Sequence, residues 1–160
     1  MSCDVAMAAY LFLASTGPAS SLPAHTPILT AASSASVASE PLFADIVRRA
    51  GRLKAEVERY RAASPRTSAS ALALPGFSGF QAQVAELSKL DMQGHVQLAK
   101  TGADGDLKCI LKGISEDLPV KLKALVDAST GASQDLALRD MAYLLNDNVE
   151  VITAPPAPSA

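Results

Sequence analysis

The sequence predicts an all-α protein: a small antiparallel bundle of four to five helices that follows an N-terminal arm rich in alanine, serine and proline. Hydrophobic residues make up 49% of the 160 residues, whereas aromatic residues make up 4% and tryptophan is absent. Alanine supplies much of the apolar content, and alanine favours helix. Apolar residues recur at spacings of three and four in segments between residues 40 and 152. The connections between these segments are short, which favours antiparallel neighbours.

The chain is long enough for one domain with one core. We divide it into an arm over residues 1–38, a helical domain over 39–153 and a proline-rich tail over 154–160. The arm contains an apolar run at 5–14, which is too short to span a bilayer as a helix. A secretory signal usually opens with Lys or Arg, but Asp4 is the only early charge. We therefore expect residues 5–14 to dock on the helical body or on a partner, with membrane contact as the less favoured alternative.

The first helix is predicted to follow Ser39, a favoured cap residue, with Glu40 and Pro41 in its first turn. Its apolar residues occupy the a and d positions of one narrow seam, at spacings of 3, 4, 3, 4 and 3: Phe43, Ile46, Ala50, Leu53, Val57 and Tyr60. Four arginines lie off this seam: Arg48, Arg49, Arg52 and Arg59. A seam this narrow needs a facing helix, from the same chain or from another.

A second helix is predicted to begin near Ser78, because Phe77, Phe80, Val84 and Leu87 repeat the same spacing. The pattern loses phase at Asp91, and Gly94 is a plausible C-terminal stop. Residues 95–111 fit either a hairpin, because the stretch TGADGD is typical of turns, or a helix. The helix is favoured, because Asp106 can act as its cap and apolar residues follow at helical spacing: Leu107, Ile110, Leu111, Ile114 and Leu118.

Pro119 is predicted to end or kink that helix, because the residue before a proline avoids helical geometry. Asp117 can then cap a further helix, whose apolar stripe is Leu118, Leu122, Leu125 and Val126. A last helix is predicted to open at Ser133, with a seam of Leu138, Met141, Leu145, Val149 and Ile152.

Motifs that would indicate catalysis or metal binding are not recognisable. The two histidines and two cysteines are mutually distant and have no zinc-ligand spacing. The aspartates at 104–106 do not continue as a calcium loop, because Lys108 and Cys109 occupy positions that such a loop needs for other residues. We expect no catalytic residues, no cofactor and no metal. Distant cysteines also favour a reducing compartment, and we predict a cytoplasmic location.

The charge distribution indicates which classes of partner the sequence favours. The net charge is −2, which argues against nucleic acid as a partner. Residues 40–66 carry seven Lys or Arg against four Asp or Glu, whereas residues 67–160 carry seven against eleven. A basic helix and an acidic remainder can complement each other within one fold. Binding of an anionic partner by the arginines, and an enzyme of unrecognised type, are weaker alternatives.

These observations favour a non-enzymatic helical interaction protein, an adaptor, regulator or scaffold subunit that acts through contacts with another protein or with a second copy of itself. The alternative is an exported or envelope-associated helical protein in which residues 1–20 form a signal or anchor. The candidate partner interface lies on the first helix and comprises Phe43, Ile46, Arg48, Arg49, Arg52, Leu53, Val57, Arg59 and Tyr60.

Overall fold

A computed structural model describes residues 34–63, 71–102 and 105–154, and these residues are helical almost throughout. The elements in chain order are α1 (Ser34–Ser39), α2 (Pro41–Ala63), the short 3₁₀ helix η1 (Ala71–Ala73), α3 (Phe77–Thr101), α4 (Gly105–Asp127) and α5 (Gly131–Thr153). The prediction of an all-α fold is therefore confirmed. The apolar run at 5–14, most of the predicted arm and the end of the tail lie outside the described residues.

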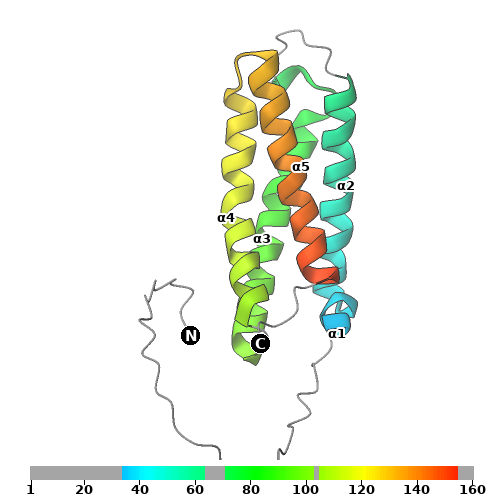
Figure 1. The fold of residues 1–160 in the computed structure, drawn as a ribbon, viewed down its shortest axis with the longest axis vertical. Helices are drawn as coiled ribbons and strands as arrows, with labels where there is room; N and C mark the ends of the chain where they lie inside the picture. Colours follow the sequence, from blue (N-terminus) through cyan, green and yellow to red (C-terminus); the bar gives the residue numbers. More distant parts are fainter. Residues whose placement is uncertain (1–33, 64–70, 103–104, 155–160) are drawn as a thin grey trace, which may run out of the picture. The chain divides into compact units, whose positions relative to one another are not determined.

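The four long helices run up, down, up and down along one bundle (Figure 1). The most extensive contacts join α3 to α4 and α2 to α5, and smaller contacts of α4 with α5 and of α2 with α3 close the square. The bundle therefore consists of two layers, α2/α5 and α3/α4. In this arrangement α3 and α5 lie diagonally across the core, as do α2 and α4.

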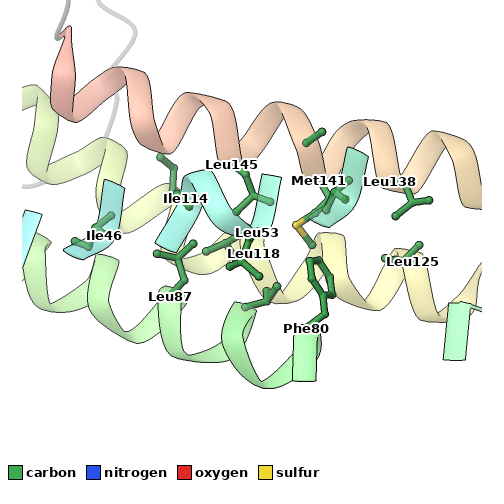
Figure 2. Close-up of a cluster of buried hydrophobic side chains, with 14 of the residues drawn as sticks. Ile46, Leu53, Phe80, Leu87, Ile114, Leu118, Leu125, Leu138, Met141 and Leu145 are labelled. Atoms are coloured by element: carbon green, nitrogen blue, oxygen red, sulfur yellow. The ribbon is translucent and has the colours of Figure 1, made fainter. Parts of the chain in front are cut away.

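The core of the bundle is aliphatic, with a small aromatic cluster near one end. All four long helices contribute side chains to it, and Figure 2 shows these side chains meeting between the ribbons. The aromatic cluster joins the end of α2 to the start of α3, where the ring centroids of Tyr60 and Phe80 lie 5.6 Å apart and those of Phe77 and Phe80 lie 5.8 Å apart. The predicted seam positions are buried on every long helix, apart from four that are half-buried: Ile110, Leu122, Val126 and Val149.

The first long helix begins slightly later than the sequence suggests. Ser39 is the last residue of α1 rather than the cap of the next helix, and Glu40 forms the bend between α1 and α2. The short helix α1 covers residues assigned to the arm and packs against both α2 and α5. Its Val37 and Ala38 contact the core, so the helical body begins before residue 39.

The predicted end of the second helix at Gly94 is wrong. The helix α3 continues to Thr101 and ends at Gly102, which adopts the left-handed conformation with φ of 67°. Gly94 is buried instead, because a Cβ atom there would lie 3.1 Å from Leu111 Cδ1, 3.2 Å from Phe43 Cε1 and 3.5 Å from Ile46 Cδ1. Glycine at this position lets side chains of α2 and α4 approach the α3 backbone closely.

A matched pair of glycine substitutions tests this role. Gly51 lies on the exposed side of α2, where an added Cβ atom would have nothing within 4 Å, so Gly51→Ala should raise the free energy of unfolding by about 0.5–1 kcal/mol. Gly94→Ala should lose most or all of that gain, because Leu111 and Phe43 must move. Urea unfolding of both variants measures the difference, and an equal gain at the two sites would contradict close packing at Gly94.

The helix α4 is continuous from Gly105 to Asp127 and contains Pro119 in its interior, so the predicted break near Asp117 is wrong. A proline inside a helix has no N–H for the carbonyl group four residues earlier, here that of Ser115. The Ser88 hydroxyl of α3 donates to this Ser115 carbonyl oxygen at 2.8 Å. A side chain from the neighbouring helix thus satisfies the acceptor that the proline leaves without its usual partner.

The remaining boundaries agree more closely with the sequence. Helix rather than hairpin is confirmed for the part of residues 95–111 that the structure describes, where the end of α3 and the start of α4 lie. The last helix begins at Gly131, two residues before the predicted start. Thr130 caps it and exchanges hydrogen bonds with Ser133 in a capping box.

Candidate functional site

The predicted interface on α2 divides into a buried half and an exposed half. Its apolar members are at most 5% exposed and belong to the core of the chain itself: Phe43, Ile46, Leu53, Val57 and Tyr60. The facing helices for this seam therefore come from the same chain. In this fold these side chains are not available to a partner, and the arginines remain as the accessible part of the predicted interface.

Three of these arginines, Arg48, Arg52 and Arg59, are exposed at helical spacing and form a stripe on the outward face of α2. Arg49 is half-buried, and its Nε lies 2.9 Å from Asp45 Oδ2. We refer to Arg48, Arg52 and Arg59 as the arginine stripe. Arg52 forms no ion pair within the described residues.

The acidic partners of the stripe differ from those that the charge distribution suggests. Arg48 pairs with Asp45, and Arg59 Nη2 lies 4.0 Å from Glu56 Oε2, so both partners belong to α2 itself. Within the described ranges, the acidic remainder of the chain supplies one ion-pair partner to α2, at Arg61, whose Nε lies 3.1 Å from Asp135 Oδ1 on α5. Ion pairs within α2 therefore neutralise more of its arginines than ion pairs with the acidic segments of the chain do.

The outward face of α5 is acidic and carries two exposed apolar side chains. Leu136 is 48% exposed and Tyr143 is 63% exposed, and they lie seven residues apart on the same face. Asp147 and Glu150 are exposed beside them and have no ion pair in the described part of the chain. We call Leu136, Tyr143, Asp147 and Glu150 the α5 face. The i, i+3 spacing of its two carboxylates is visible in the sequence, but exposure of Leu136 and Tyr143 follows only from how α5 is packed.

A polar pair lies in the core between α3 and α5. Asp91 and Asn148 are both 0% exposed, and Asn148 Nδ2 donates a hydrogen bond to Asp91 Oδ2 at 2.9 Å. Burial raises the pKa of Asp91 to about 8, and the hydrogen bond from Asn148 acts in the opposite direction. In the sequence Asp91 is visible only as a break in the apolar pattern. Asn148 has a signal that could have revealed the pair, because it follows Leu145 and precedes Ile152 at seam spacing.

Two other polar side chains have structural contacts. His95 is half-buried, and its Nδ1 lies 2.7 Å from the carbonyl oxygen of Lys108. This contact joins α3 to α4. The Tyr60 hydroxyl lies 2.7 Å from Glu56 Oε1 and 3.0 Å from the Pro75 carbonyl oxygen. Burial and the hydrogen bond to Glu56 raise the pKa of Tyr60 to about 12. Both residues hold connections between helices in place.

The described residues show neither a metal centre nor a membrane span. They contain no group of three or more His, Cys, Asp or Glu side chains placed to hold a metal ion. No helix among them is long and apolar enough to cross a bilayer. Cys109 is half-buried on α4 and is not a free thiol.

Comparison with known proteins gives no further assignment: the sequence matches no family model, and no curated protein or solved structure is significantly similar to it.

Proposed function

We propose that the protein is a non-enzymatic helical interaction protein that acts through the exposed faces of α2 and α5. The observation that carries the proposal is the opposite charge of two neighbouring outward faces, each with unpaired charges. Arg52 on the arginine stripe has no ion pair within the described residues, and neither have Asp147 and Glu150 on the α5 face. Complementary charges of this kind favour orientation and specificity in protein association.

The partner that fits both faces is a second copy of this chain. Lys54 Nζ of α2 donates a hydrogen bond to Asn146 Oδ1 of α5 at 2.9 Å. Because Arg52 and Asp147 are close in sequence to these two residues, their heights along the bundle axis differ by no more than about one helical turn. A two-fold contact that brings Arg52 to the partner copy's α5 face therefore also brings Asp147 to the partner copy's arginine stripe.

The energy of such a contact must come mainly from apolar burial. Exposed ion pairs contribute little, typically about 0–1 kcal/mol, whereas tyrosine is enriched among the residues that dominate interface energies. Tyr143 is 63% exposed on the α5 face and can supply such an anchor. The charges then decide orientation, and they make the association dependent on salt.

The experiment is light scattering of the native protein at low and high salt, followed by a charge swap. We expect a dimer at low salt that weakens at high salt. Arg52→Glu and Asp147→Arg should each weaken the dimer about tenfold or more by placing like charges together, and the double variant should restore it.

Lys89→Glu is the matched control, because Lys89 is 71% exposed on α3 and the substitution makes the same charge change away from both faces. This control should leave the dimer unchanged. A monomer at both salt concentrations would overturn self-association through these faces, and so would a dimer that Arg52→Glu and Lys89→Glu weaken equally.

A further inference from the structure

The Asp91–Asn148 pair bridges the two helices that face each other diagonally across the core. The helix α3 packs mainly against α4, and α5 packs mainly against α2, so a bond between α3 and α5 also joins the two layers. Among the Asp, Glu, Lys and Arg residues that the structure describes, Asp91 alone is fully buried. The pair therefore contributes to the contact that holds the two layers together.

One oxygen atom on each member of the pair has no hydrogen-bond partner among the described residues. Asp91 Oδ2 accepts from Asn148 Nδ2, but Asp91 Oδ1 and Asn148 Oδ1 are buried and unpaired. Both are acceptors when Asp91 is ionised, so neither can satisfy the other. A proton on Asp91 Oδ1 changes this, because the resulting hydroxyl can donate to Asn148 Oδ1. An acid and an amide then share two parallel hydrogen bonds, and both unpaired oxygens are satisfied.

We propose that Asp91 and Asn148 form a proton-bridged acid–amide pair that locks the α2/α5 layer to the α3/α4 layer, and that loss of this proton loosens the contact between the layers.

Charged groups on the surrounding helices do not replace this proton. The pKa of Asp91 is set by burial and by the hydrogen bond from Asn148, with no contribution from a neighbouring charge. None of the titratable groups on the adjoining parts of these helices is buried; they are Asp45 and Arg49 on α2, Lys89 and His95 on α3, Lys108 and Lys112 on α4, and Asp147 and Glu150 on α5. An ionised Asp91 would thus be left without a counter-charge among apolar side chains, which is unfavourable.

Separation of the layers is the movement that would relieve an ionised Asp91. Other polar contacts hold each layer together internally, since Ser88 and His95 of α3 bind backbone carbonyl oxygens of α4. Likewise, Lys54 and Arg61 of α2 bind Asn146 and Asp135 of α5. Opening between the layers leaves these contacts intact, breaks those of Gln97 with Glu40 and of Lys121 with Asp140, and admits water to Asp91.

The direction of the pH effect follows from the pKa values. The pKa of Asp91 is raised from 3.8 to about 8 in the folded protein, so between these values the folded state holds a proton that the unfolded state has released. Stability that depends on this proton is fully present below about pH 4, falls as the pH rises, and is lost above about pH 8. Over the steepest part, the unfolding equilibrium constant should rise nearly tenfold per pH unit.

The experiment compares the wild-type chain with Asp91→Asn by urea unfolding between about pH 5 and pH 9, a range that brackets the raised pKa. An asparagine can form the same two hydrogen bonds with Asn148 without a titrating proton. We therefore expect Asp91→Asn to fold. Its unfolding equilibrium constant should lack the nearly tenfold rise per pH unit, and at the alkaline end of the range this variant should be more stable than the wild type. In parallel, the side-chain carboxyl ¹³C signal of Asp91 in the wild-type protein should titrate near pH 8.

Asp117→Asn is the matched control, because it makes the same chemical change at an exposed position on α4 and should keep the wild-type pH dependence. An Asp91 carboxyl signal that titrates near about pH 4, the ordinary range of an aspartate, would overturn the proposal even if Asp91→Asn failed to fold. Equal pH dependence of the wild type and a folded Asp91→Asn would overturn it as well.

Discussion

Replacement of Phe80 by alanine should lower the free energy of unfolding by about 3–5 kcal/mol, which is the largest effect expected for a single substitution in this core. The Phe80 side chain is 0% exposed and contacts aromatic rings from two elements, with Tyr60 edge-on at 5.6 Å and Phe77 stacked at 5.8 Å. Figure 2 shows the Met141 side chain of α5 directed toward the same ring. The substitution removes buried area and leaves a cavity that side chains from several helices line.

Urea unfolding monitored by circular dichroism measures this loss. Leu136→Ala is a suitable control, because Leu136 is 48% exposed on α5 and its truncation should change stability by only about 0.5 kcal/mol. A loss below about 1.5 kcal/mol at Phe80 would contradict the packing described for the α2–α3 end of the bundle.

The second large effect is expected at Ser88. Its hydroxyl donates to the Ser115 carbonyl oxygen at 2.8 Å, and Ser115 is itself 5% exposed. Ser88→Ala should lower the free energy of unfolding by about 1–3 kcal/mol, because it leaves a buried acceptor without a partner. The loss arises only because Pro119 has no N–H to donate to that carbonyl.

A double-mutant cycle separates this explanation from a simple loss of packing. In a Pro119→Ala background the new backbone N–H can bind the Ser115 carbonyl oxygen, so the loss caused by Ser88→Ala should be smaller than in the wild type by at least about 1 kcal/mol. Equal losses in the two backgrounds would mean that Ser88 and Pro119 act independently.

The proposed interaction faces and the buried pair differ in how visible they are in the sequence. The arginine stripe can be recognised from its position off the seam, and the acidic spacing of Asp147 and Glu150 is equally plain. The exposure of Tyr143 depends on the rotation of α5 in the bundle. Asp91 looks like an interruption in a helical pattern, because its partner Asn148 lies 57 residues away.

Sequence alone was sufficient for the helical class, the seam of α2 and the positions that form most of the core. These properties depend on local spacing: residues three and four apart share one face of a helix whatever surrounds it. The start of the last helix could also be placed to within two residues, since capping is a local interaction.

Packing between helices determines where a helix continues past a residue that usually ends one, and which contacts the polar side chains make. Gly94 resembles a helix stop, yet α3 passes through it because Phe43, Ile46 and Leu111 pack against its bare backbone. Pro119 resembles a helix break, yet α4 continues because a hydroxyl on α3 binds the carbonyl group that the proline leaves unpaired. In both cases a contact distant in sequence compensates a local penalty. Such compensation depends on which helices become neighbours, and local spacing carries no information about that choice.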